Sequence, residues 1–302
     1  VSAFVILALG LGLGLGLTLG GGNDAEGDLS NAAPLAPPPA DLQIWKPSVN
    51  ATWQIVLLKP LALAPDANSV EPDVDVYDID LFINPKSTVD ALHRLGKRVV
   101  CYFSGGSYEP NRPDSKSFKD SDKGKGLEGW PGERWLNLNS EGVRQIMAKR
   151  IQLAAQKGCD AIDPDNVDGF DNKNGLGLTQ ADSIRFMSYL VQQAQKHNMA
   201  IGLKNAAKII PSVLPAMQFS VNEQCVQYAD CRSFAPFVEA GKPVFHIEYP
   251  SEVKPDFAAN FCNKDFKPAQ GSDGFSTVIK NMNLDGWVVY CNGQTARTPL
   301  AD

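Results

Sequence analysis

Strand-like runs alternate with helical stretches along most of this 302-residue chain. Short runs rich in β-branched and aromatic residues begin at Trp53, Val74, Arg98, Asp160, Met199, Gln218 and Pro243, and an eighth begins at either Phe275 or Trp287. Between them, residues 140–157 and 180–197 show the clearest helical spacing of apolar residues. This alternation predicts a parallel sheet, and eight strands in about 260 residues favour a single (β/α)₈ TIM barrel of the α/β class. A doubly wound open sheet is the alternative.

The start of the chain is expected to lie outside this barrel. Residues 1–19 are an uncharged run long enough to cross the hydrocarbon core of a bilayer. We interpret residues 1–22 as a signal anchor, with a cleaved signal peptide as the alternative. Residues 23–42 are rich in Gly, Ala and Pro and predict a flexible stalk, which leaves residues 43–302 for the barrel.

Either interpretation of the first segment directs the barrel into the secretory pathway. We therefore expect it at the extracellular face of the plasma membrane or in the cell wall, or secreted if the segment is cleaved. Asn50 then becomes a glycosylation acceptor, because it begins the triplet Asn-Ala-Thr.

The six cysteines are expected to play different roles. Cys225 and Cys231 are close enough in sequence for a local disulfide, and a bridge between Cys262 and Cys291 would tie the carboxyl-terminal segment. Cys101 and Cys159 are predicted in neighbouring strands, as buried free thiols rather than a disulfide.

The charge of the chain limits the classes of ligand. Its 34 acidic and 28 basic residues give a net charge of −6, which argues against nucleic acid and favours a neutral or cationic ligand. No cofactor or metal is expected, because the chain has three histidines, no C-x-x-C pair and only a superficial likeness to a calcium loop at residues 163–174. We expect a monomer that contacts the membrane through its amino-terminal segment only.

Polar residues gather where the predicted strands end, which is the edge at which barrel enzymes carry their sites. The candidate binding residues there are Tyr102, Ser104, Asp163, Asn166, Asp168, Lys204, Asn205, Glu248 and Tyr249. A long insertion at residues 107–139, predicted to be mobile around residues 119–125, adds Tyr108, Glu109 and Trp130.

Carboxylates dominate this edge and indicate the chemistry. Two opposed carboxylates are what glycoside hydrolysis requires, and Asp165 and Glu223 follow strands that lie two places apart. Lys204, on the strand between them, would hold a carboxylate ionised. Asp163 also fits a buried structural acid, and Glu248 a partner of Lys204. No histidine is placed as the base of a serine or cysteine triad.

Taken in order, these motifs resemble glycoside hydrolase family 114. The matching residues are Tyr-Phe-Ser-Gly-Gly-Ser at 102–107, Asp-Pro-Asp-Asn at 163–166, Gly-Leu-Lys-Asn at 202–205, Asn-Glu-Gln-Cys at 222–225 and Ile-Glu-Tyr at 247–249. The resemblance extends from about residue 45 to residue 291. It implies a TIM barrel that hydrolyses α-1,4-linked galactosamine polymers, the galactosaminogalactan of fungal walls, from within, with Asp165 and Glu223 as the catalytic pair.

Resemblance to other barrel α-glycosidases also suggests the roles of this pair. Asp165 would be the nucleophile and Glu223 the general acid/base of a retaining mechanism, with inversion as the alternative. An acidic cleft suits a cationic or partly acetylated galactosamine polysaccharide, and Tyr102, Tyr108, Trp130 and Tyr249 offer aromatic faces. The other functions to consider are a non-catalytic barrel that binds wall polysaccharide and a glycosidase for a neutral α-glycan.

Overall fold

A mixed sheet of ten strands forms the centre of the fold. The computed structural model describes residues 33–250, 261–263 and 265–301, and all structural statements below refer to them. In spatial order the strands are β1 (Trp53–Val56), β2 (Val76–Asp80), β3 (Arg98–Ser104), β7 (Ala161–Asp165), β8 (Ala200–Lys204), β9 (Phe219–Glu223), β10 (Val244–Glu248), β11 (Ser276–Ile279), β12 (Trp287–Tyr290) and β13 (Thr295–Arg297). The strands from β1 to β11 pair in parallel, whereas β12 and β13 add antiparallel pairs.

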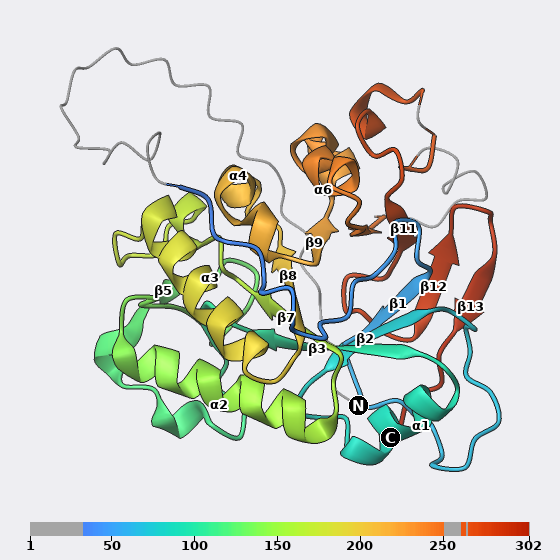
Figure 1. Ribbon diagram of the computed structural model, residues 1–302, viewed down its shortest axis with the longest axis horizontal. Helices are drawn as coiled ribbons and strands as arrows, with labels where there is room; N and C mark the ends of the chain where they lie inside the picture. Colours follow the sequence, from blue (N-terminus) through green and yellow to red (C-terminus); the bar gives the residue numbers. More distant parts are fainter. Residues whose placement is uncertain (1–32, 251–260, 264, 302) are drawn as a thin grey trace, which may run out of the picture. The chain divides into compact units, whose positions relative to one another are not determined.

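The strand order confirms the predicted α/β architecture. Every predicted run contains a strand, and both candidates for the last one are strands: β11 is the eighth parallel strand, and β12 is antiparallel to it. The strands follow one another around the sheet without the reversal of order that defines a doubly wound sheet. The fold is therefore a curled, TIM-like sheet (Figure 1).

No backbone hydrogen-bond ladder pairs β1 with β11 among the described residues. Hydrogen bonds made by side chains link the two ends of the parallel sheet instead. The Trp53 indole N–H donates to the carbonyl of Ser276 (2.7 Å), and the Ser276 hydroxyl donates to the carbonyl of Ala51 (2.7 Å). Lys280 donates to Gln54 Oε1 at 2.8 Å. Figure 1 accordingly shows β1, near the start of the chain, beside the carboxyl-terminal strands.

Because side chains alternate between the two faces along each strand, the apolar residues form two clusters, one on each face of the sheet. Inward-facing residues such as Val76, Val100 and Phe245 form one cluster inside the curled sheet. Outward-facing residues such as Ile79 and Cys101 pack under the helices in the other. Toward the carboxyl ends of the strands the inward-facing residues are polar, and the candidate site lies at this end of the sheet.

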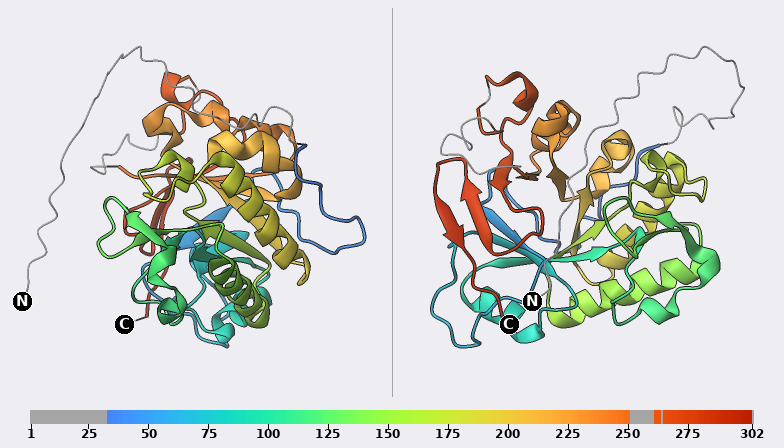
Figure 2. Two further views of the ribbon diagram at one scale, coloured as in Figure 1. Left: turned by 90° about the vertical axis from the view of Figure 1, so that its left-hand side faces the viewer. Right: turned by 180° about the vertical axis from the view of Figure 1, so that it is seen from behind.

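Helices cover the outside of the sheet, but the layer is incomplete. The helices are α1 (Lys86–Arg94), α2 (Glu141–Lys157), α3 (Gln180–Gln195), α4 (Ile210–Val213), α5 (Cys225–Tyr228) and α6 (Ala235–Glu239). As predicted, α2 starts at Ser140, whose hydroxyl accepts from the Val143 N–H, and stops at Gly158, which has a left-handed φ of 91°. Residues 57–75, after β1, contain no helix. The longest helices, α2 and α3, lie side by side (Figure 2).

The insertion after β3 forms a small antiparallel sheet of β4 (Ser107–Tyr108), β6 (Arg134–Leu136) and β5 (Lys123–Gly126). Residues 119–125, predicted to be a mobile loop, instead form a 3₁₀ turn and strand β5. The Lys123 ammonium lies 4.1 Å from the centre of the Tyr108 ring, which fastens this strand to β4.

The folded unit begins earlier in the chain than expected. Residues 1–32, which include the predicted anchor and part of the predicted stalk, lie outside the described residues. Leu35 belongs to the remainder of that stalk, yet its N–H donates to the carbonyl of Ser212 (2.7 Å) and its side chain packs on the core. In the described part of the chain, no helix has both the length and the apolar character needed to cross a bilayer.

Three disulfides pair all six cysteines. Cys225–Cys231 and Cys262–Cys291 are confirmed. The prediction of free thiols at Cys101 and Cys159 was wrong: they form a third disulfide, with their Cα atoms 6.0 Å apart. Cys101 faces outward on β3 and Cys159 lies just before the neighbouring strand β7, and the prediction that the two lie on adjacent strands did not show that their sulfur atoms come within bonding distance. Asn50, the predicted glycosylation acceptor, is exposed in a turn before β1.

Candidate active site

One buried lysine lies among three carboxylates at the carboxyl end of the sheet. Lys204 ends β8, is 1% exposed, and its Nζ lies 3.8 Å from Asp163 Oδ2, 3.8 Å from Asp165 Oδ2 and 3.6 Å from Glu223 Oε2. Burial opposes its charge, but Asp165, Glu223 and Asp163 outweigh burial and raise the pKa of Lys204 above its ordinary value. Lys204 is therefore a fixed positive charge between the two predicted catalytic residues.

Asp165 is held from two sides. The Tyr102 hydroxyl donates to Asp165 Oδ2 (2.9 Å), and the Asn166 N–H donates to Oδ1 (2.7 Å). The N–H groups of Gly105 and Gly106 also donate to the Asp165 carbonyl. A Cβ on Gly106 would lie 1.8 Å from the carbonyl oxygen of Asn166, so only glycine permits this close approach.

Glu223 ends β9 and accepts from several donors. The Tyr249 hydroxyl donates to Oε1, and the Asn205 amide donates to Oε2 at 3.1 Å. Burial alone would raise the pKa of Glu223, but Lys204, Tyr249 and Asn205 outweigh it and hold that pKa below its ordinary value. Glu223 is accordingly ionised in the unliganded site.

The two predicted catalytic carboxylates face the same ammonium, which limits their separation. Because Asp165 Oδ2 and Glu223 Oε2 lie 3.8 and 3.6 Å from Lys204 Nζ, these two oxygens are at most about 7.4 Å apart. Retaining enzymes typically place their carboxyl groups about 5–5.5 Å apart, and inverting enzymes about 6.5–9.5 Å apart. This upper bound is compatible with either kind of enzyme.

A polar pocket of about 540 Å³ opens beside Glu223. Of the predicted binding residues, Asp168 and Asn205 line it. Burial, followed by the charge of Asp165, raises the pKa of Asp168 to about 7. The pocket has the size of a small-molecule site and reaches one member of the carboxylate pair.

Among the pocket-lining residues that sequence reasoning missed are two acids and an aromatic residue, namely Asp171, Asp230 and Tyr228. Tyr228 is 65% exposed at the end of α5, in the loop that the Cys225–Cys231 disulfide closes. Tyr228 follows Glu223 by five residues and lies between two cysteines predicted to form a disulfide. This position in the sequence could have identified it as a candidate site residue.

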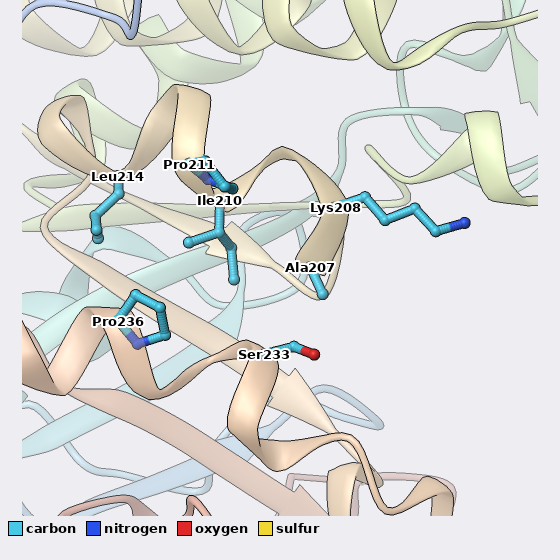
Figure 3. Close-up of a pocket in the computed structure, with 7 residues that line it drawn as sticks. All are labelled: Ala207, Lys208, Ile210, Pro211, Leu214, Ser233 and Pro236. Atoms are coloured by element: carbon cyan, nitrogen blue, oxygen red, sulfur yellow. The ribbon is translucent and has the colours of Figure 1, made fainter. Parts of the chain in front are cut away.

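A second, largely apolar pocket of about 490 Å³ adjoins the first. The two share Ala207, Lys208 and Ser233, and the second is completed by Ile210, Pro211, Leu214 and Pro236. Figure 3 shows the apolar side chains of α4 facing Pro236 of α6, whereas Lys208 points away from them. The groove beside Glu223 therefore continues over α4 and α6.

Ser104 and Asn166 form a network behind Asp165 rather than part of the polar pocket. The Asn166 amide donates to the hydroxyls of Ser104 and Ser107, each at 3.1 Å, and Ser107 donates to Glu133 (3.2 Å). Burial raises the pKa of Glu133 to about 7, with Glu109 as the next contribution. Glu133 is a further acidic group near Asp165 that the sequence did not single out.

Four more of the predicted binding residues line neither pocket. Asp163 is fully buried below Asp165, and Glu109 pairs with Arg112, which also pairs with Asp80. Tyr108 packs against Lys123. Trp130 is 54% exposed near the tip of the insertion, but it lines neither pocket.

Glu248 is turned away from the site. It is completely buried, and its Oε1 accepts from the Val226 N–H (2.7 Å) and lies 2.9 Å from His246 Nε2. Because side chains alternate along a strand, Tyr249 faces the site and Glu248 faces α5. Its predicted role in binding substrate was wrong.

Among the described residues, one group of potential metal ligands comes together: Cys225, Cys231 and His246. The two cysteines are joined in a disulfide, so their sulfurs are not thiolate ligands. The arrangement around Asp165 and Glu223 suits acid/base and nucleophilic chemistry with carboxylates.

Comparison with known proteins identifies the family. The model of glycoside-hydrolase family GH114 matches residues 34–296. The chain shares 53% sequence identity with Aspergillus fumigatus Ega3, and the crystal structure of Ega3 in complex with galactosamine matches this fold with a TM-score of 0.74. The match covers 82% of this chain and 97% of that one. The glycoside hydrolase domain of PelA from Pseudomonas aeruginosa shares the fold at 14% identity (TM-score 0.64; 79% and 98% covered). No curated protein matches the chain. The chain belongs to glycoside hydrolase family 114.

Proposed function

We propose that this glycoside hydrolase cleaves α-1,4-galactosaminidic bonds within galactosamine-containing polysaccharide such as galactosaminogalactan. The observation that carries the proposal is the 53% identity, over most of the chain, to Ega3, whose crystal structure holds galactosamine. The carboxylate pair beside an open pocket supplies the chemical groups that such a reaction needs.

The charge of the pocket supports a cationic substrate. Asp168, Asp171 and Asp230 line it together with Glu223, and Lys208 is its basic residue. Lys208 pairs with Asp171, which leaves the pocket with an excess of negative charge. An acidic pocket attracts the ammonium group of a deacetylated galactosamine unit, and the exposed Tyr228 offers a ring face to the sugar.

The proposed reaction is a double displacement. An oxygen of Asp165 attacks the anomeric carbon while the Glu223 carboxyl gives its proton to the departing glycosidic oxygen. Ionised Glu223 then takes a proton from water, the water oxygen attacks the anomeric carbon, and Asp165 leaves. Because Lys204 and its other partners lower the pKa of Glu223 in the free site, this role requires that its pKa rise when substrate excludes water.

We further propose that the enzyme acts as a monomer outside the cell, anchored by its amino-terminal segment or secreted after cleavage. Three disulfides among the described residues favour an oxidising compartment. Asn50 is exposed and so accessible to glycosylation. Mass spectrometry and fractionation of the protein produced in its own cells test these points together.

The experiment that tests the activity is incubation of the purified enzyme with partly deacetylated galactosaminogalactan, followed by sizing of the products. We expect a ladder of internal fragments, and none from the double variant Asp165→Asn/Glu223→Gln. The anomeric form of the first product, read by NMR, separates retention from inversion. Cleavage of a neutral α-glucan but not of the galactosamine polymer would support the neutral-glycan alternative. Binding without cleavage would support the non-catalytic one.

A further inference from the structure

Two carboxyl groups lie buried in the sheet interior beneath the catalytic pair. Asp78 on β2 and Asp163 on β7 are 1% and 0% exposed, and they flank β3. Asp163 sits one inward position below Asp165, because residues two apart on a strand face the same side. No N–H or O–H group of the other described residues donates a hydrogen bond to any of their four carboxyl oxygens.

Ionising both of these buried carboxyl groups at once would cost considerable free energy. Removing a carboxylate from water without a hydrogen-bond donor is strongly unfavourable, and two such charges side by side repel each other. Among the described residues, Lys204 is the cation beside the pair, 3.8 Å from Asp163, and it also faces Asp165 and Glu223. A proton between the two carboxyls removes one charge and turns one of them into a donor for the other.

We propose that Asp78 and Asp163 share one proton, with Asp78 donating a hydrogen bond to Asp163, and that this pair is a positioning device for Lys204. Ionised Asp163 accepts this hydrogen bond and attracts the Lys204 ammonium from the interior of the sheet. Protonated Asp78 is neutral, so it adds no second negative charge there. Lys204 thus keeps its charge available to Asp165 and Glu223. The link to catalysis rests on the proposed function, whereas the shared proton does not.

The titratable groups around the pair agree with this arrangement. The groups on the same inward face are Asp80 on β2, which pairs with Arg112, Tyr102 on β3, Asp165 on β7, Lys204 on β8 and Glu223 on β9. Burial, followed by the charge of Asp163, raises the pKa of Asp78 well above its ordinary value, whereas burial raises the pKa of Asp163 to about 7, so the pair holds a single proton at pH values above 7. Each of the two carboxyls shifts the pKa of the other.

Proton linkage tests the shared proton without any substrate. Asp78 takes up its proton on folding, so the wild type loses stability relative to Asp78→Asn as pH rises from the unfolded pKa toward the folded one. We expect the difference in free energy of unfolding between the two proteins to change from pH 7 to pH 8, where Asp163 is ionised, with a slope of one proton. A flat difference would mean that Asp78 is ionised in the folded protein, and would overturn the proposal.

Asp182→Asn is the matched control. Asp182 is also largely buried, but hydrogen bonds from Thr179 and Asn139 outweigh its burial and lower its pKa, so it is already ionised at pH 5. Its difference from wild type should stay flat over the same range. Infrared spectroscopy of the wild type is the second measurement if Asp78→Asn does not fold. A protonated-carboxyl band at neutral pH that Asp163→Asn alters supports the pair, and its absence contradicts it.

Activity then tests the positioning role. Asp78→Leu removes the donor, and we expect kcat to fall at least tenfold, with both limbs of the pH profile displaced and KM less affected. Asp78→Asn, whose amide donates to Asp163, should restore most of the loss. If Asp78→Leu lowers stability but leaves the pH profile of kcat unmoved, the pair is only structural and the positioning role is wrong.

Discussion

The Tyr249 hydroxyl donates a hydrogen bond to Glu223 Oε1, joining residues at the ends of the neighbouring strands β9 and β10. Burial and the charge of Glu223 hold the pKa of Tyr249 well above its ordinary value, so the phenol remains a donor. The contact stabilises the ionised form of Glu223. It thus sets the pH range in which Glu223 changes protonation.

Tyr249→Phe removes this donor while keeping the ring. We expect the pKa of Glu223 to rise, so the limb of the pH–rate profile that Glu223 controls should move to higher pH. The rate at the optimum should fall by about ten- to hundredfold, since a hydrogen bond to a charged group contributes ~1.5–3 kcal/mol. Initial rates on the polymer across pH measure both effects. A profile that coincides with wild type would mean that Tyr249 has no influence on Glu223.

Lys204→Met removes the cation that faces both carboxylates. Without it the pKa of Glu223 should rise, and we expect kcat/KM to fall by about 10²–10³, as for the loss of a preorganised electrostatic partner. Lys242→Met is the matched control, because Lys242 is a partly buried lysine that donates to the carbonyl of Leu214 (2.6 Å), away from the carboxylate pair. Equal losses in the two variants would indicate general destabilisation.

Tyr228→Ala tests the ring face at the pocket. Loss of an aromatic contact worth ~0.5–1.5 kcal/mol should raise KM about three- to tenfold, with kcat less affected, and Tyr228→Phe should resemble wild type. Trp130→Ala serves as the comparison, because Trp130 is similarly exposed but lines neither pocket. A larger effect at Trp130 would place the bound polymer along the insertion instead.

The disulfides should differ in what they stabilise. Replacing Cys101 and Cys159 by Ser opens a loop of 58 residues and should cost about 4 kcal/mol, whereas replacing Cys225 and Cys231, six residues apart, should cost about 2 kcal/mol. The second pair should affect KM more, because its loop carries Tyr228 and Asp230. Denaturant unfolding and steady-state kinetics of both double variants give this comparison; the reverse ranking of stability would refute it.

Glu248 should matter for folding and not for substrate. Glu248→Leu leaves the Val226 N–H without its acceptor and should reduce stability by about 1–3 kcal/mol. Glu248→Gln keeps an oxygen in that position, so its KM for the polymer should match wild type. A raised KM in a fully folded Glu248→Gln protein would return Glu248 to the binding site.

The strand periodicity was sufficient to predict the eight parallel strands and the edge that carries the polar residues. Alternation and composition are local properties, so the starts of the eight parallel strands could be read to within about two residues, together with the helix over residues 140–157. The meeting of the two ends of the parallel sheet was not local: the Trp53 indole of β1 donates to the main-chain carbonyl of Ser276 on β11, more than 200 residues away.

The resemblance to the family and the spacing of acids together predicted that Asp165 and Glu223 lie at one site with Lys204 between them. The structure places all three together. The prediction that Glu248 binds substrate was wrong because adjacent residues of a strand face opposite sides of the sheet. Sequence alone does not say which of the two sides faces the interior.

The sequence by itself determined which segments are strands, which edge is polar and that carboxylates dominate it. Only the tertiary structure decided which side chains meet: Cys101 with Cys159, Asp78 with Asp163, and Tyr228 with the pocket beside Glu223. The reason is that propensity and hydrophobic period depend on neighbours in the chain. Contacts between strands depend on register and curvature, which arise only when distant segments pack against one another.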